Sequence, residues 1–164
     1  MTSLLNGPEK NEVVVQHEIH LRIAEAMKDM KKKEISEAAK SNGAKLVLFF
    51  LFIKDTSYSS VDNKYSSLQA SIMVHDEVNN TCNMYVWGEH TASRRSQEIA
   101  SCLLYHITNC LPQTTKEIIL YSDSCGGQNR NIKMALVLSY ILQKTDIKEI
   151  QQKFFSSWSQ FLYL

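Results

Sequence analysis

The chain has 164 residues, of which 44% are hydrophobic and 21% charged, with 5 glycines and 2 prolines. This composition is that of an ordinary globular domain, and it excludes wholesale disorder, collagen-like repeats and low-complexity linkers. The formal net charge of +1 excludes a globally basic nucleic-acid coat protein but leaves room for a local basic patch.

The cysteines, the N-terminal residues and the apolar runs bear on where in the cell the protein is expected. Its 4 cysteines are too few and too scattered for a secreted disulfide scaffold, and no Cys-x-x-Cys pair begins a zinc site. Residues 1–10 lack the apolar core of a signal peptide. The longest apolar run, LVLFFLFI over residues 46–53, is far shorter than the ~20 residues that span a bilayer. We therefore expect an intracellular protein, nuclear or cytoplasmic, without a membrane segment.

The sequence of the first half of the chain predicts a long helix and three strands. Residues 13–40 contain no glycine or proline and are rich in Ala, Glu, Lys and Met, which favours one helix over this range. Residues 41–43 are expected to end it, with Asn42 or Gly43 in the left-handed conformation. Residues 46–53 are uninterruptedly apolar and predict a strand buried on both faces. Residues 68–75 and 84–89 predict two further strands that form an antiparallel hairpin.

The second half predicts two helices around a short buried strand. Residues 96–110 have apolar side chains at helical spacing, with Ser96 as the expected N-cap and Pro112 beyond the end. Residues 117–121 predict the strand, and residues 131–144 predict a helix that is apolar nearly all round. This order of elements indicates an α/β fold.

The segment between that strand and the last helix is the most informative part of the sequence. It contains Ser122, Asp123, Ser124, Cys125, Gly126, Gly127, Gln128, Asn129, Arg130 and Asn131. Ligand sites of open α/β folds gather at the carboxyl ends of strands, where a carboxylate such as Asp123 can hold Mg²⁺ and glycines let a phosphate approach. A structural interpretation stays open, in which Asp123 fixes the loop, the two glycines make the turn and Asn131 caps the helix.

Two other groups of residues carry weaker chemical signals. Cys102, His106 and Cys110 share one face of the helix over residues 96–110, where metal ligation is conceivable, but these are also core positions and we favour the core. Cys125 precedes a helix N-terminus and could act as a nucleophile, yet no histidine or asparagine partner can be assigned to it.

Three stretches resemble a family of transposon-derived eukaryotic proteins that is usually described only as a domain of unknown function. They are residues 84–89, 96–104 and 120–131, and the likeness runs from about residue 20 to residue 154. The order of elements also resembles the ribonuclease H-like fold of DDE transposases and retroviral integrases. The resemblance implies a ribonuclease H-like mixed sheet flanked by helices, incomplete at the C-terminus, with a long N-terminal helix.

In that fold three carboxylates bind two Mg²⁺ ions that activate water or a 3′-hydroxyl and stabilise the leaving oxygen. The resemblance gives Asp123 the position of the second acid. The family's Phe-Asp-Leu-Gln-Lys run on the first strand corresponds here to FLFIK over residues 50–54, so Leu51 stands where the first acid is expected. Asp55 and Asp76 are candidates for a substitute acid, and the third acid is expected beyond Leu164.

The resemblance therefore implies a remnant of a transposase-like DNA nuclease or strand-transferase domain that is catalytically inactive. Asp123 would be a vestigial acid and a weak metal ligand, with no cofactor bound, whereas an intact family member would use Mg²⁺. The alternative is a nucleic-acid- or protein-binding module co-opted from a transposon. An active enzyme needs a second carboxylate within about 4–6 Å of Asp123.

A DNA-binding module instead needs clustered cations on one face of the protein. The candidates are Arg94, Arg95, Arg130 and Lys133.

The resemblance also suggests a division of the chain. We expect an N-terminal helical extension over residues 1–43, a truncated ribonuclease H-like domain over residues 44–155 and an out-of-frame tail over residues 156–164. The family continues after Lys153 and Phe154 with a Gly-His-Ser-Phe-like motif, which the neighbouring reading frame of this tail could encode. We therefore expect that a frameshift near residues 155–157 produced a tail that packs arbitrarily.

Overall fold

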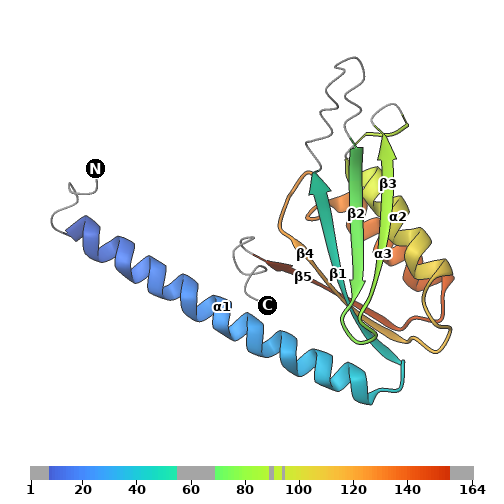
Figure 1. The fold of residues 1–164 in the computed structure, drawn as a ribbon, viewed down its shortest axis with the longest axis horizontal. Helices are drawn as coiled ribbons and strands as arrows, with labels where there is room; N and C mark the ends of the chain where they lie inside the picture. Colours follow the sequence, from blue (N-terminus) through green and yellow to red (C-terminus); the bar gives the residue numbers. More distant parts are fainter. Residues whose placement is uncertain (1–7, 55–68, 89–90, 94, 156–164) are drawn as a thin grey trace, which may run out of the picture.

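The computed structural model describes residues 8–54, 69–88, 91–93 and 95–155. Its elements are α1 (Pro8–Lys40), β1 (Lys45–Lys54), β2 (Gln69–Asp76), β3 (Thr81–Gly88), α2 (Ser96–Asn109), β4 (Glu117–Asp123), α3 (Ile132–Lys144) and β5 (Glu149–Phe155). The strands form one sheet, α2 and α3 cover one of its faces, and α1 crosses the other (Figure 1). The predicted α/β class is confirmed.

The sheet is mixed, with the strand order β3-β2-β1-β4-β5. β1 pairs antiparallel with β2, β2 antiparallel with β3, β1 parallel with β4, and β4 parallel with β5. The two strands predicted to be buried, β1 and β4, are thus neighbours at the centre of the sheet, and the predicted hairpin is β2–β3.

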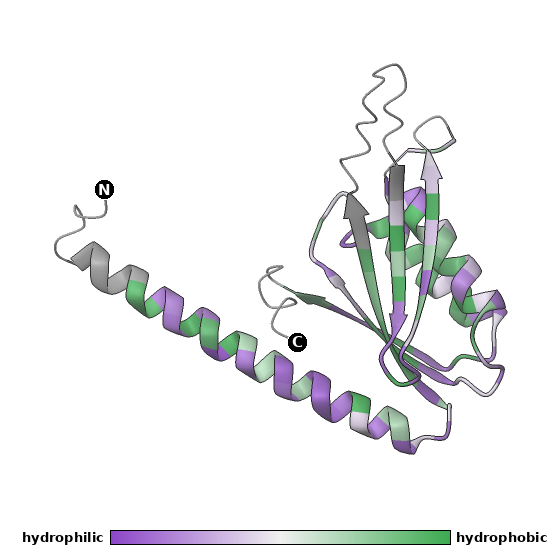
Figure 2. Ribbon diagram, viewed as in Figure 1, coloured by the Kyte–Doolittle hydropathy of each residue, from purple (hydrophilic) through white to green (hydrophobic). Residues whose placement is uncertain are grey.

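Alternation along the central strands divides the core into two layers. Leu46, Leu48 and Phe50 of β1 pack with residues of α2 and α3, whereas Val47 and Phe49 pack on the α1 side. Because successive side chains of a strand point to opposite faces, a strand between two helical layers must be apolar throughout, as β1 is. Figure 2 shows this run of hydrophobic residues along β1.

Helix α1 packs on the sheet only through its second half. Met27, Ile35 and Ala38 contact the cluster around Phe49, and the first half extends beyond the sheet (Figure 1). The helix ends in a left-handed turn, with φ of 53° at Asn42 and 83° at Gly43, as the sequence predicts.

The structure differs from two local expectations. The N-cap of α2 is Arg95 rather than Ser96, which is the first helical residue. Helix α3 is apolar nearly all round, as predicted, but it is buried on one side only, since Ile132 and Leu136 are 71% and 61% exposed. The sequence does not predict strand β5, because EIQQKFF mixes polar and apolar residues. Such a mixture suits the edge of the sheet, where β5 lies. The predicted tail, residues 156–164, lies outside the described residues.

Candidate functional site at the carboxyl end of strand β4

Asp123 ends β4 and organises the loop that follows it. Its Oδ1 accepts hydrogen bonds from the backbone N–H of Cys125 at 3.1 Å and from Nδ2 of Asn129 at 2.6 Å. The carbonyl of Cys125 in turn accepts the N–H groups of Gln128, Asn129 and Arg130. An aspartate that bonds the backbone two residues on is a common device of turns. Asp123 therefore fixes the loop, as the structural interpretation of the sequence expects.

A buried polar layer lies beneath this loop. Ser122 and Asn129 are both fully buried, and Nε2 of Gln152 donates to the Ser122 hydroxyl at 3.4 Å and to the Asn129 carbonyl at 3.3 Å. The side-chain Oδ1 of Asn129 has no hydrogen-bond partner among the described residues. Sequence reasoning missed Gln152, because its role depends on β5 lying beside β4.

Asn131 is the N-cap of α3. Its Oδ1 accepts the N–H of Met134 at 3.1 Å, and its Nδ2 donates to the carbonyls of Gly126 and Gln128 at 3.3 and 2.9 Å. One asparagine thus joins the loop to the first turn of the helix, and the predicted capping role is confirmed.

The turn itself does not require its two glycines. Both are exposed and neither has a positive φ. A Cβ atom added at Gly127 would meet no atom within 4 Å, and one added at Gly126 would meet only the Arg130 carbonyl at 4.0 Å. Gly126 and Gly127 do make the turn, as predicted, because the Gln128 N–H bonds to the Cys125 carbonyl around them. The turn needs no glycine-specific φ, so what the pair adds is a loop surface without side-chain bulk.

The position beside Asp123 on β1 carries an apolar side chain. Phe50 pairs with Ser122 in the parallel register. The next residues, Leu51 and Asp123, therefore lie side by side on adjacent strands. Strand alternation puts both on the α1 side of the sheet. Leu51 is only 6% exposed. The structure thus places together the two positions that the resemblance assigns to acids, and one of them is leucine.

Asp76 does not supply a substitute acid. It pairs with Leu48, three residues before Leu51, so it lies about 10 Å along the strands from the level of Asp123 and two strands away from it. Its carboxylate accepts the N–H groups of Val78 and Asn79 in the β2–β3 turn. The suggestion that Asp76 replaces the first acid is therefore wrong. Asp55 lies outside the described residues.

Three cationic side chains and two helix N-termini share the edge at which β4 ends. Helices α2 and α3 both begin there, after β3 and β4, which run in the same direction. Arg95, Arg130 and Lys133 are exposed. Lys133 lines a small depression between α2 and α3 together with Gln97 and Ser101. Arg94, the fourth predicted cation, lies outside the described residues.

The helix face with Cys102, His106 and Cys110 is not arranged as a metal site. His106 is buried and its Nδ1 lies 2.8 Å from the Tyr85 hydroxyl, which is 3.7 Å from the thiol of Cys110. Burial lowers the pKa of His106 and raises that of the Cys102 thiol. Within the described part of the chain no three His, Cys, Asp or Glu residues form a metal-binding group. The core interpretation holds for His106, whereas Cys110 is exposed.

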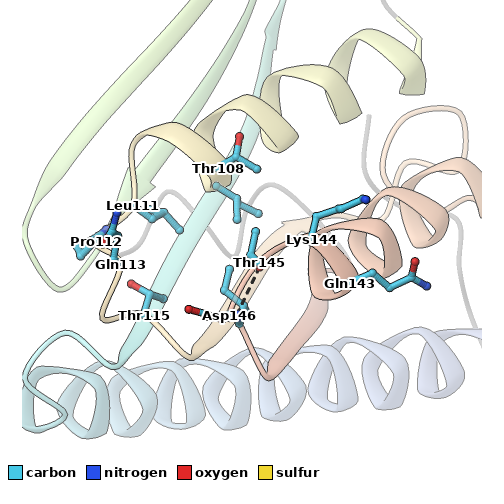
Figure 3. A pocket seen from close by; sticks show the side chains of 11 residues that line it. Thr108, Leu111, Pro112, Gln113, Thr115, Gln143, Lys144, Thr145 and Asp146 are labelled. Carbon is cyan, nitrogen blue, oxygen red and sulfur yellow. Dashed lines mark hydrogen bonds between the residues drawn. The ribbon is translucent and has the colours of Figure 1, made fainter.

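A cavity of about 540 Å³ lies at the other ends of α2 and α3. Thr108, Pro112, Gln143 and Asp146 line it (Figure 3). None of its lining residues belongs to the Asp123 loop, so it does not contribute to the candidate site.

The strand order, the one strand (β2) that runs antiparallel to the other four and the helices on both faces are consistent with a ribonuclease H-like fold. No family model and no curated protein matches the chain, so membership of the transposon-derived family stays a prediction. A chain in the structure of a simian T-cell lymphotropic virus intasome in complex with PP2A regulatory subunit B56 gamma is similar with a TM-score of 0.43 and 10% identity. The match covers 70% of this chain and 36% of that chain. Among the described residues, no helix has the length and apolar character needed to cross a membrane.

Proposed function

We propose that this chain is a catalytically inactive relative of transposase-like domains that binds the nucleic-acid backbone along the edge where β4 ends, without cutting it. The observation that carries the proposal is the gathering of Arg95, Arg130 and Lys133 at the edge where α2 and α3 begin. Phosphates are bound by Arg and Lys side chains and by the N–H groups of helix N-termini. The exposed glycine pair next to Arg130 leaves the loop backbone accessible to such a phosphate.

The acidic groups at this edge are already engaged. One oxygen of Asp123 accepts two hydrogen bonds within its loop. The carboxylate of Glu98 accepts hydrogen bonds from the Ser93 hydroxyl and the Arg95 N–H, and the bond from Ser93 lowers the pKa of Glu98. These bonds orient the two carboxylates but leave them charged, so the described edge carries three cations against two anions and keeps a net positive charge.

The same geometry supports binding without cleavage. Two-metal phosphoryl transfer needs several carboxylates that clamp both ions, and the level of Asp123 on β1 is occupied by the buried Leu51. A single aspartate with one oxygen committed to the loop does not fit a pair of Mg²⁺ ions. We therefore derive no metal-dependent step for this chain.

The experiment is a titration of fluorescein-labelled 30-bp duplex DNA, followed by anisotropy at several salt concentrations. We expect the double variant Arg130→Ala/Lys133→Ala to weaken binding about tenfold and to reduce the slope of log affinity against log salt by about 2. The matched control, Lys144→Ala/Lys148→Ala, removes two exposed lysines far from the β4 loop and should bind as the parent does. Equal losses in both double variants, or a parent that does not bind at 50 mM salt, would contradict the proposal.

Cleavage is tested separately with supercoiled plasmid and Mg²⁺ or Mn²⁺. The plasmid should remain intact. Nicking that disappears in Asp123→Ala would show that the domain is an active nuclease.

A further inference from the structure

Helix α1 carries several large apolar side chains that the described structure leaves exposed. Val14, Val15, Ile19, Leu21, Ile23 and Met30 are each between 37% and 57% exposed. A helical segment of this length is marginally stable in water unless its apolar face packs against a partner. The exposed residues therefore indicate an interface rather than an ordinary solvated helix.

Most of these side chains fall on one stripe. Val15, Ile19, Ile23, Ala26 and Met30 follow one another at steps of 4, 4, 3 and 4 residues, the spacing of a helix–helix seam. At 100° per residue the stripe lies about a quarter turn from Met27, Glu34 and Ala38, the residues with which α1 packs on its own sheet. The stripe thus stays exposed while α1 is docked, with one contact at its end, where Nζ of Lys153 lies 3.7 Å from Sδ of Met30.

We propose that this stripe pairs with the same stripe of a second copy of the chain, in antiparallel orientation, about a two-fold axis beside Ile23. The spacing is nearly symmetric about that point. Val15 then lies opposite Met30 of the second copy, and Ile19 lies opposite Ala26, so that a large side chain meets a small one. A seam that is complementary to itself is what a two-fold symmetric dimer requires.

The charges beside the stripe favour the antiparallel orientation. Glu18, Arg22, Glu25 and Asp29 share one flank of it. About the axis at Ile23, Arg22 faces Glu25 of the second copy, and this contact occurs twice. In a parallel pair this flank would face the opposite flank of the second helix, so Arg22 and Glu25 would not meet. One pair of like charge, Glu18 with Asp29, remains near the ends, where Arg22 also contacts Glu18 of its own helix at 2.7 Å.

The antiparallel arrangement also has room for both sheets. Each sheet packs on the second half of its own α1, so the two sheets lie at opposite ends of the helix pair. The edge with Arg130 stays outside this interface, and the inference therefore does not depend on the proposed function.

The experiment measures the mass of the full chain by light scattering and its dissociation constant by sedimentation. We expect a dimer that the double variant Ile19→Glu/Ile23→Glu converts to a monomer with unchanged thermal unfolding of the sheet domain. The matched control is Leu136→Glu, an equally exposed apolar residue on α3, which should leave the dimer intact. A parent that is monomeric at 200 µM, or a dimer that Leu136→Glu dissociates, overturns the inference.

A charge exchange tests the orientation. Arg22→Glu alone should raise the dissociation constant about tenfold, because it places two glutamates in contact at both ends of the axis. The exchange Arg22→Glu/Glu25→Arg should restore it. In a parallel dimer position 22 does not face Glu25, so an unchanged dissociation constant excludes the antiparallel arrangement.

Discussion

Leu51 and Asp123 occupy neighbouring positions at the centre of the sheet, where a single residue decides whether two carboxylates could meet. Leucine at this position is buried and extends the apolar face of β1 on the α1 side. Asp123, in contrast, uses its carboxylate to hold the loop. The apolar residue therefore stabilises the sheet at a place where an acid would need a cation.

This juxtaposition predicts the behaviour of Leu51→Asp. We expect the free energy of unfolding to fall by about 3 kcal/mol, because a carboxylate replaces a buried apolar side chain. Millimolar Mg²⁺ should raise the melting temperature of the variant, since the ion can be shared by two adjacent carboxylates of the folded state only. Leu51→Asn, measured in the same thermal unfolding series, should be destabilised without a response to Mg²⁺. A variant that ignores Mg²⁺ would show that the two positions do not converge.

His106 links the stability of the fold to pH. Burial lowers the pKa of its imidazole, and the nearby Asp76 offsets only part of this effect. The unfolded chain therefore takes up a proton near the ordinary pKa of 6.5 that the folded chain does not bind. We expect stability to fall as the pH drops below about 6.5, and His106→Gln to flatten this dependence in urea titrations at pH 5 to 7.5. An unchanged slope in His106→Gln would assign the pH dependence to other groups.

Single residues of the candidate site differ in how well the sequence predicts them. The cap at Asn131 and the left-handed turn at Asn42 and Gly43 depend on local backbone chemistry, and both are predicted correctly. The contact of Gln152 with the Asn129 carbonyl joins β5 to the loop after β4, and no local pattern encodes such a contact. The unstrained φ angles of the glycine pair could not be predicted either, because glycine fits ordinary and unusual turns alike.

At the scale of elements, α1 is held on the sheet by a buried polar cluster as well as by apolar contacts. The Tyr121 hydroxyl donates to Glu34 at 2.5 Å, and Lys153 of β5 forms an ion pair with the same carboxylate. Burial and the bond to Glu34 raise the pKa of Tyr121. The rings of Phe49, Tyr121 and Phe155 stack beneath the helix. One glutamate thus joins α1 to both β4 and β5.

Glu34→Ala should therefore weaken the attachment of α1. We expect a loss of about 2 kcal/mol in the free energy of unfolding, because the Tyr121 hydroxyl and the Lys153 ammonium lose a charged partner. Glu37→Ala is the matched control: this glutamate lies one turn further along α1 and makes an exposed ion pair with Lys45, so the change should be below about 0.5 kcal/mol. Equal effects of the two variants in urea denaturation would contradict the proposed role of the cluster.

The sequence predicts some strands better than others. β1 and β4 are short apolar runs between turn signals, and the sequence predicts both to within about three residues. β5 has Glu149 and Gln151 exposed on an edge strand, so its pattern resembles that of a loop. Its position becomes evident only from the parallel register with β4.

At the scale of the whole molecule, the two helical layers cover different parts of the core. The layer of α2 and α3 completes the main core over β1 and β4. The α1 layer covers a smaller aromatic cluster, and half of that helix extends away from it (Figure 2). The sheet edge with the β4 loop and the free half of α1 are therefore separate surfaces, so the proposed binding of nucleic acid and the proposed pairing with a second copy would not compete.

The central place of β1 also has a consequence for synthesis on the ribosome. The strand is apolar on both faces, and its partner β4 follows about 70 residues later in the chain. At translation rates of roughly 5–20 residues per second, the segment waits roughly 4 to 14 s for that partner. Pairing with β2, which is made earlier, protects only one edge in that interval. The nascent chain therefore presents an extended hydrophobic segment that chaperones can bind before the sheet is complete.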